Sequence, residues 1–327
     1  MSLPNHFPAI GTRTTATGRP LERMSTPIPA PGRDEVLIEV RATSLNPLER
    51  KLADINFLHR KLPSPLGFDA AGVIVATGSA VRGFTVGDEV MAMLDPTLGG
   101  CWADGSVGYA VAQPWLVAHK PAAMTFEQAG MLPIAFLAAW EGLDRQVIAG
   151  DTVFIPGGGG GVGHLAVQLA TWTFGARVIT TAGRDASARL ARESGATEVL
   201  DYRAGDVTAR VLELTGGHGV DVAFDATYNE DSFVQSARTV RPGGKWVVLG
   251  VGPGKTTRVS ETESPVDGIL SAKGAAHINA NVLRYFTEPA MSAPGVRQHL
   301  TEGLNQATRL FEDGRLRPHA SLTVPGT

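Results

Sequence analysis

The sequence predicts an α/β protein with a doubly wound parallel sheet and a second, β-rich domain. At residues 151–170 an apolar strand enters a glycine turn and leaves as an amphipathic helix, and strand and helix patterns then alternate as far as residue 249. The first ~120 residues instead hold short strand patterns separated by glycines and prolines. A chain of 327 residues also exceeds one typical domain.

The glycine turn at residues 157–161 is typical of a site for a dinucleotide pyrophosphate. Glycines without side chains let the backbone approach phosphate oxygens, and the first N–H groups of the following helix face the anion. Gly163 lets this helix pack closely on the strand. We predict that the cofactor is bound by Gly158, Gly160, Gly161, Val162 and Gly163.

Two other interpretations of five successive glycines are a flexible loop and the phosphate-binding loop of nucleotide triphosphatases. The triphosphatase loop requires Lys and then Ser or Thr after its last glycine, whereas His164 and Leu165 follow Gly163. A flexible loop is disfavoured because small and apolar residues recur at helical spacing from Val162 to Ala170, and Gly175 then offers a helix stop.

The elements after the turn follow in a regular order. We expect strands at 177–181, 198–200, 220–224 and 245–249, helices at 186–193, 207–215 and 231–240, and a further strand at 274–278 that closes the far edge of the sheet. In the first part, strands are expected at 36–42 and 70–77, and 87–91 reads as a turn entering a third. The predicted domains are 1–122, 123–279 for the cofactor, and a return of the chain to the first domain over 280–327.

Composition narrows the class of function. Hydrophobic residues make up 43% of the chain and charged residues 19%, and the net charge of −3 gives no basis for binding nucleic acid. No apolar run reaches the ~18 residues that span a bilayer, and the N-terminus lacks a signal-peptide pattern. We therefore expect a cytoplasmic protein that acts on a small molecule and has neither nucleic acid nor membrane as a partner.

Metal and thiol chemistry find little support in the sequence. The only cysteine, Cys101, excludes an internal disulfide and a multi-cysteine zinc site; it is either an apolar filler or a reactive thiol. The eight histidines form no close-set ligand pair, so no catalytic metal is expected.

Several segments together resemble the medium-chain dehydrogenase/reductase superfamily. They are Ser44-Leu-Asn-Pro-Leu-Glu49, Gly67-Phe-Asp-Ala-Ala-Gly72, Gly87-Asp-Glu-Val90, Val117-Ala-His-Lys-Pro121, Leu132-Pro133, the glycine turn and Arg241-Pro-Gly-Gly-Lys245. The resemblance implies a GroES-like β domain before a Rossmann domain, with the active site in the cleft between them. It is strongest to the zinc-independent branch of quinone oxidoreductases and zinc-type alcohol-dehydrogenase-like proteins, because Asn46-Pro-Leu-Glu-Arg-Lys51 approximates the pattern of that branch.

The resemblance also implies an activity. Zinc-dependent members have a Cys ligand near Ser44 and Gly-His-Glu where this chain has Gly67-Phe68-Asp69, so both ligands are missing. Without a Lewis acid the oxidation of an alcohol is disfavoured, whereas hydride transfer to a conjugated double bond remains feasible. We expect a reductase of quinones or α,β-unsaturated carbonyls that forms a homodimer. The alternatives are an enoyl reductase acting on a thioester in natural-product biosynthesis and a non-catalytic, NADPH-binding regulatory protein.

The expected cofactor is NADPH. The second strand ends in Thr180-Thr-Ala-Gly-Arg184, so a cation precedes Asp185 where NAD-binding proteins place an acid. Arg184 can form a forked contact with a 2′-phosphate, assisted by Ser187 and Arg189, although a solvated loop arginine is the plain alternative. Tyr202 matches a position that contacts the phosphate on the adenine side in NADPH-dependent relatives.

The remaining site residues are assigned mainly from the resemblance. Asn46 matches an asparagine beside the nicotinamide ribose, Lys51 is a candidate donor to the cofactor or the developing enolate oxygen, and Tyr109 is a candidate proton donor to the α carbon. Their plain alternatives are a turn residue before proline, a surface lysine and a packed aromatic ring, with water as the proton source. Tyr228, Val251 and Asn279 lie near the carboxyl ends of strands, where ligands of such sheets bind.

Two departures from the family pattern affect the substrate site. Relatives have threonines after Leu-Pro, one of them near the carboxamide, where this chain reads Leu132-Pro-Ile-Ala-Phe-Leu-Ala-Ala-Trp140. Relatives also continue through another helix and strand beyond the position of Thr327.

Overall fold

The computed structural model describes residues 3–18, 20–103, 107–250, 265–288 and 293–320. The chain divides into two compact units. The first consists of residues 1–137 and 283–327, and the second is the continuous stretch 138–282. No helix of the described ranges has both the length and the apolar composition that crossing a membrane requires.

The second unit contains a parallel sheet of six strands, as predicted. Its strands are β9 (Thr152–Ile155), β10 (Arg177–Ala182), β11 (Glu198–Asp201), β12 (Val220–Asp225), β13 (Val240–Leu249) and β14 (Ala276–Ala280). Their order across the sheet is β11-β10-β9-β12-β13-β14, so the chain first builds outward from β9 on one side and then crosses to the other. The expected far-edge strand is confirmed, because β14 pairs with β13 from Lys245↔Ala276 to Leu249↔Ala280.

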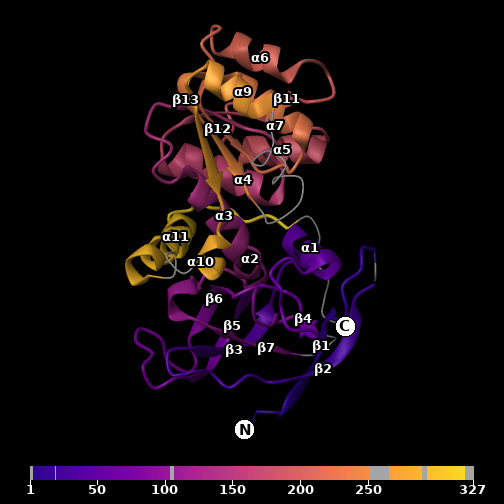
Figure 1. Ribbon diagram of the computed structural model, residues 1–327. Coiled ribbons are helices and arrows are strands. Elements are labelled where there is room, and N and C mark those ends of the chain that lie inside the picture. Colours follow the sequence, from indigo (N-terminus) through magenta and orange to yellow (C-terminus); the bar gives the residue numbers. More distant parts are fainter. Residues whose placement is uncertain (1–2, 19, 104–106, 251–264, 289–292, 321–327) are drawn as a thin grey trace. The chain divides into compact units, whose positions relative to one another are not determined.

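Helices connect these strands in two groups. They are α4 (Gly161–Gln168), continued by a π-helical turn, η2 (Leu169–Thr173), then α5 (Asp185–Glu193), α6 (Val207–Leu214), α7 (Glu230–Thr239) and α9 (Pro265–Ala272). Helices α4 and α5 contact each other and strands β9 to β11, whereas α7 contacts β12, β13 and its neighbours α6 and α9 (Figure 1). Apolar side chains close the space under α6, α7 and α9 around Trp246, whose indole N–H donates to Ser236 Oγ at 2.9 Å. The doubly wound arrangement is thereby confirmed.

The first unit contains two antiparallel sheets. The larger has the order β7-β3-β5-β6-β8 and the smaller β2-β1-β4. Their strands are β1 (His6–Thr12), β2 (Glu22–Pro27), β3 (Val36–Ala42), β4 (Ser64–Pro65), β5 (Asp69–Thr77), β6 (Glu89–Met93), β7 (Gly108–Ala112) and β8 (Val117–His119). The three strands expected from the sequence appear as β3, β5 and β6, and the β1–β2 hairpin is an addition that the sequence pattern did not predict.

Helical segments complete this unit. They are α1 (Pro47–Ile55), the 3₁₀ turn η1 (Pro114–Leu116), α2 (Phe126–Gly130), α3 (Pro133–Leu143), which begins here and ends in the second unit, α10 (Arg284–Thr287) and α11 (Pro294–Glu312). Helix α11 packs against β8 and η1. Thr301 Oγ1 donates to the Trp115 carbonyl at 2.9 Å, and the Arg297 guanidinium lies 4.8 Å from the centre of the Trp115 ring. The chain therefore returns to its first unit after residue 282.

Candidate cofactor and substrate site

The glycine turn joins β9 to α4 and is held by two threonines of β10. Gly157 adopts a φ of +73°, which favours glycine, and its N–H donates to Thr181 Oγ1 at 3.0 Å. The Gly158 N–H donates to Thr180 Oγ1 at 2.9 Å. The turn is thus fixed by the neighbouring strand, so its conformation does not depend on a ligand.

The space around the turn separates two kinds of glycine. A Cβ on Gly158, Gly159 or Gly163 would overlap Thr180 Oγ1, the Ser187 carbonyl or the Gly157 carbonyl, respectively. A Cβ on Gly161 would instead meet none of the described residues within 4 Å. Gly158, Gly159 and Gly163 must therefore be glycine for the turn to pack against its neighbours, whereas Gly161 borders space that the described residues leave open.

This open space lies at the start of α4, where backbone donors are available. Gly160 caps the helix without a side chain, and the amides of Gly161, Val162 and Gly163 precede the first N–H that can bond within the helix. These amides and the positive end of the helix fit the two phosphates of a dinucleotide. The predicted residues Gly158, Gly160, Gly161, Val162 and Gly163 therefore form one continuous cradle.

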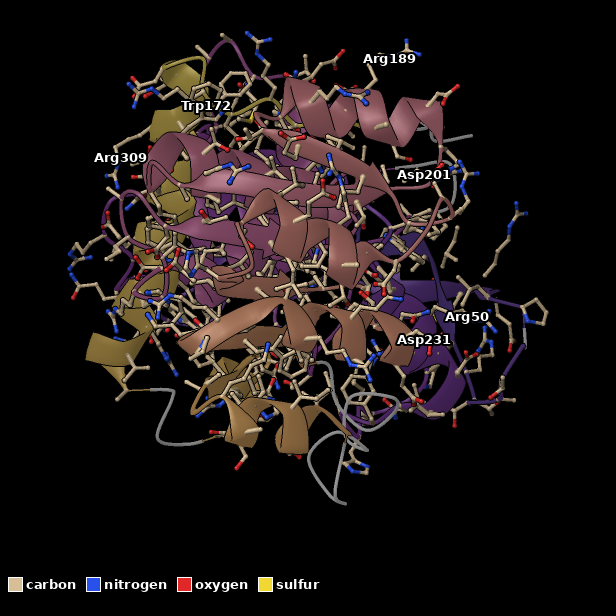
Figure 2. All side chains as sticks on the ribbon, turned by 90° about the horizontal axis from the view of Figure 1, so that it is seen from above. Arg50, Trp172, Arg189, Asp201, Asp231 and Arg309 are labelled. Atoms are coloured by element: carbon tan, nitrogen blue, oxygen red, sulfur yellow. The ribbon has the colours of Figure 1, made fainter. Side chains whose placement is uncertain are left out.

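The carboxyl ends of β10 and β11 bring Arg184 and Tyr202 to one edge of the sheet. A Cβ on Gly183 would overlap the Tyr202 ring, so this ring lies on the backbone next to Arg184. Arg184 is exposed at the cap of α5, and its side chain makes no hydrogen bond or ion pair in the described part of the chain, whereas its backbone carbonyl accepts the Ala188 N–H at 2.9 Å. Ser187, on the first turn of α5, lies against Gly159. Figure 2 shows Arg189 projecting outward from the same helix.

The nearby acid, Asp201, already has a cationic partner. Arg203 Nε lies 3.0 Å from Asp201 Oδ1 and Nη2 lies 2.9 Å from Oδ2. Hydrogen bonds from the Arg203 side chain and backbone lower the pKa of Asp201 to about 2. Arg184 therefore keeps its charge available for an anion at this edge.

The loop after β12 is fixed by a buried carboxylate. Asp225 Oδ1 accepts hydrogen bonds from the Thr227 N–H and Oγ1 at 2.9 and 2.7 Å, and Oδ2 accepts from Ser232 and Ser236 at 2.7 and 2.9 Å. Tyr228, which follows Thr227 in the chain, adopts a φ of 55°, which is uncommon for a bulky residue. Burial raises the pKa of the Tyr228 hydroxyl. Thr227 lies beside Gly157, so this loop and the glycine turn occupy the same edge of the sheet.

The last two predicted cofactor residues have different outcomes. Asn279 is exposed near the end of β14, and its amide occupies the space that a Cβ on Gly250 would need. Val251 lies outside the described residues. In the same strand, the ring centres of His277 and Trp246 lie 4.9 Å apart, and His277 Nδ1 lies 3.3 Å from Asp267 Oδ1. These contacts account for His277 as a structural residue.

In the first unit, Asn46 belongs to a hydrogen-bonded cluster around Asp69. Asn46 Nδ2 and Ser44 Oγ donate to Asp69 Oδ2 at 2.8 and 2.5 Å, and the Ile134 N–H donates to Oδ1 at 2.7 Å. Asp69 is fully buried, and this burial raises the pKa of its carboxyl group to about 6. The cluster joins the start of α1, the start of β5 and the start of α3.

A second buried acid, Glu49, lies beside this cluster. Its carboxylate accepts from the Asn46 N–H at 2.7 Å and the Phe68 N–H at 3.3 Å. Burial, and secondly the charge of Asp69, raise the pKa of Glu49 to about 7. No role was predicted for Ser44, Glu49 or Asp69 from the sequence, although all three stand inside two of the segments that carry the family resemblance.

The structure places the other two catalytic candidates differently. Lys51 lies half-buried on α1, and burial lowers the pKa of its amino group. Tyr109 packs in an apolar cluster with Phe7, and its hydroxyl lies 3.3 Å from Glu39. Neither Phe7 nor Glu39 belongs to the hydrogen-bonded cluster of Asn46 and Asp69. The contacts of Tyr109 therefore fit the alternative given above, a packed aromatic ring.

Phe68, at the position that the family resemblance compares with a histidine ligand of zinc, and the single cysteine are both packed into the interior. Phe68 is fully buried with the Arg60 guanidinium 5.4 Å from its ring centre. Cys101 is also buried, and burial raises the pKa of its thiol to about 12, which disfavours the reactive-thiol alternative. Over the ranges that the structure describes, no group of three or more His, Cys, Asp or Glu residues is arranged to hold a metal ion.

The parallel sheet, its glycine cradle and the separate β-rich unit define a two-unit dinucleotide-binding protein. Residues 32–128 match the family model for the alcohol dehydrogenase GroES-like domain, and residues 161–282 match that of the zinc-binding dehydrogenases. The chain belongs to the medium-chain dehydrogenase/reductase superfamily, in its quinone oxidoreductase-like branch.

Two similar proteins are named as oxidoreductases. A quinone oxidoreductase of Pseudomonas aeruginosa is 34% identical over 261 residues, which cover 79% of this chain and 76% of the relative. A chloroplastic NADPH-dependent alkenal/one oxidoreductase of Arabidopsis thaliana is 36% identical over 227 residues, 68% of this chain but only 56% of the relative. The chain thus spans little more than half the length of that protein.

The fold is also found in solved structures. An alcohol dehydrogenase superfamily protein from Novosphingobium aromaticivorans superposes with a TM-score of 0.79 at 32% identity, over 95% of this chain and 88% of that protein.

Proposed function

We propose that this protein is an NADPH-dependent reductase of quinones or α,β-unsaturated carbonyls that works without a metal. The observation that carries the proposal is the segment Gly67-Phe68-Asp69. Its Phe68 stands where zinc-dependent members of the superfamily have a histidine ligand, and the Asp69 carboxylate is engaged in hydrogen bonds. The names of the relatives from Pseudomonas aeruginosa and Arabidopsis thaliana support the same class of substrate.

The residues of the second unit would bind and orient the cofactor. The amides of Gly161, Val162 and Gly163 would hold the pyrophosphate, and the Arg184 guanidinium would pair with a 2′-phosphate beside Tyr202 and Ser187. Tyr228, Val251 and Asn279 would border the nicotinamide end. Arg184 is uncommitted while Asp201 is paired with Arg203, and this supports a preference for NADPH over NADH.

The residues of the first unit would act on the nicotinamide end and on the substrate. Bound NADPH supplies hydride to the β carbon of the conjugated substrate. Asn46 would accept a hydrogen bond from the ribose, and Lys51 would donate to the oxygen on which negative charge develops. Water would then protonate the α carbon, because the Tyr109 hydroxyl faces Glu39.

The test begins with titration of the purified protein by NADPH and by NADH. Quinones, enones and enoyl thioesters are then added, and absorbance of the reduced nicotinamide is followed with and without prior treatment with EDTA. We expect tighter binding of NADPH and EDTA-insensitive oxidation by a quinone or an enone. Turnover with thioesters alone would favour the enoyl reductase, and NADPH binding without any turnover would favour a regulatory role. Failure to bind either nucleotide would refute the proposal.

We further propose that the protein forms a homodimer. Strand β14 is the last strand of its sheet among the described residues and offers an edge for pairing with a second copy. Light scattering coupled to size-exclusion chromatography should give twice the chain mass of 34.3 kDa. A mass of one chain at micromolar concentration would contradict the dimer.

A further inference from the structure

Asp69 receives hydrogen bonds from two segments that are far from it in the sequence. Ser44 and Asn46 precede it by 25 and 23 residues, and Ile134 follows it by 65. All three donors lie within 2.8 Å of a carboxylate that is 0% exposed. A buried carboxylate with three short hydrogen bonds is a rigid anchor, because losing any donor leaves a charged acceptor without compensation.

This anchor fixes which way the Asn46 amide is turned. An ionised carboxylate only accepts hydrogen bonds, so the Asn46 group that faces Asp69 at 2.8 Å must be its NH₂. The same NH₂ group lies 3.1 Å from Ser44 Oγ. The carbonyl oxygen of the same amide faces the Glu49 N–H in the capping box of α1, and its second lone pair is the acceptor that remains for a hydroxyl donor.

Asp69 also joins Asn46 to the start of α3. Its second oxygen accepts the backbone N–H of Ile134, directly after Leu132-Pro133. The family resemblance implies that this segment lies near the nicotinamide carboxamide, and residues 132–140 of this chain carry no hydroxyl side chain. A single carboxylate thus sets the spacing of two segments that lie next to the reacting end of the cofactor under the proposed function.

We propose that Asp69 is a positioning residue: its carboxylate holds the Asn46 amide so that the Asn46 carbonyl oxygen accepts a hydrogen bond from the nicotinamide ribose. This proposal rests on the proposed function for the identity of the ligand. Asp69 does not touch the cofactor; it acts through Asn46.

A double-mutant cycle on NADPH affinity tests this role. In Asp69→Asn, an NH₂ group replaces one carboxylate oxygen and opposes the donors of Ser44, Asn46 or Ile134. We expect Asn46→Ala and Asp69→Asn each to weaken NADPH binding about tenfold, the loss of about one hydrogen bond. The double variant should also lose about tenfold rather than a hundredfold, because both changes remove the same interaction. Affinity for 2′,5′-ADP, which lacks the nicotinamide ribose, should stay within about twofold of the wild-type value in all three variants.

The control is Asp221→Asn. Asp221 also accepts a backbone N–H, that of Thr152 at 2.8 Å, and pairs with Arg241, but it lies near the amino end of β12. This variant should bind NADPH within about twofold of the wild type. Additive losses in the double variant, or wild-type affinity of Asp69→Asn, would overturn the positioning role. If the wild-type protein does not bind NADPH, it is the proposed function that fails.

A second variant covers the case in which circular dichroism shows that Asp69→Asn does not fold. Asn46→Asp leaves Asp69 intact but sets two carboxylates against each other, which repels the side chain at position 46. At pH 8 it should bind NADPH at least tenfold more weakly than Asn46→Ala. Equal affinity of the two variants would overturn the proposal.

Discussion

The ring of Tyr202 lies directly on the backbone of Gly183, leaving no room for a Cβ at position 183. The two residues follow adjacent parallel strands, whose register pairs Ala182 with Asp201. Because Arg184 comes next in the chain, the contact places the Tyr202 ring, which is 56% exposed, beside the backbone that leads into Arg184. Under the proposed function, Arg184 and Tyr202 are the residues expected to discriminate between NADPH and NADH.

Replacing Arg184 by alanine should weaken the binding of NADPH by about 10- to 100-fold, the usual loss for a hydrogen-bonded charge. Binding of NADH should change by less than about twofold, since NADH lacks the 2′-phosphate. Nucleotide titrations followed by fluorescence measure both affinities. The matched control is Arg192→Ala, a basic residue in the last turn of the same helix, which should change neither affinity. Equal losses for the two nucleotides in Arg184→Ala would show that Arg184 does not contact the 2′-phosphate.

Alanine at two glycines of the cradle should separate folding from binding. Gly161→Ala adds a methyl group in open space at the start of α4, so thermal stability should be kept while the affinity for NADPH falls at least about tenfold because the methyl group occupies space needed by the pyrophosphate. Gly163→Ala forces a methyl group against the Gly157 carbonyl and should lower the melting temperature. Calorimetry and nucleotide titration on both variants give the comparison. Unchanged affinity in Gly161→Ala would place the phosphates elsewhere.

Tyr228 combines a large side chain with a left-handed backbone conformation. Tyr228→Ala and Tyr228→Gly both lose the ring, and only glycine adopts this conformation without strain. The glycine variant should therefore be more stable than the alanine variant by about 1 kcal/mol in urea unfolding. Both should bind NADPH more weakly than the wild type if the ring borders the cofactor. Retention of full affinity in both would remove Tyr228 from the site.

Glu49 should make the stability of the first unit fall as the pH rises. Burial and the charge of Asp69 raise its pKa from 4.5 to about 7 in the folded chain. Between pH 4.5 and about 7 the native state therefore binds more protons than the unfolded state. The contribution of Glu49 to the free energy of unfolding is complete below pH 4.5 and is lost as the pH rises through about 7.

Glu49→Gln cannot titrate, so the free energy of unfolding of the wild type relative to this variant should decrease from pH 5 to pH 8. Urea unfolding at several pH values, followed by a signal from the first unit, measures this difference. A difference that stays constant with pH would show that Glu49 is ionised throughout the range.

The sequence predicts the second unit well because its signals are local. The glycine turn, the β10 and α5 patterns and the stop at Gly175 each depend on residues within one or two helical turns of one another, and the structure confirms them. Arg184 could be named from the end of its strand for the same reason, whereas Tyr202 was assigned from the family resemblance, and the cofactor roles of both residues stay predictions.

The first unit was harder to predict because its key contacts are distant in the sequence. The Asp69 cluster joins residues that are 23 to 65 positions apart, and no periodicity marks them. Tyr109 stays a prediction as proton donor, and only the folded chain shows that its ring packs against Phe7 and that its hydroxyl lies toward Glu39. Hydrophobic packing and long-range hydrogen bonds decide both cases.

The return of the chain to its first unit has a consequence for synthesis on the ribosome. A nascent chain that has reached residue 282 already contains all six strands of the parallel sheet in the second unit. It still lacks α11, the helix that packs against β8 and η1 of the first unit. The unit that is begun first is therefore finished last. Premature termination after that point would leave the complete parallel sheet attached to an unfinished first unit; under the proposed function, such a product would keep the residues that bind NADPH but lack part of the unit that carries the catalytic candidates.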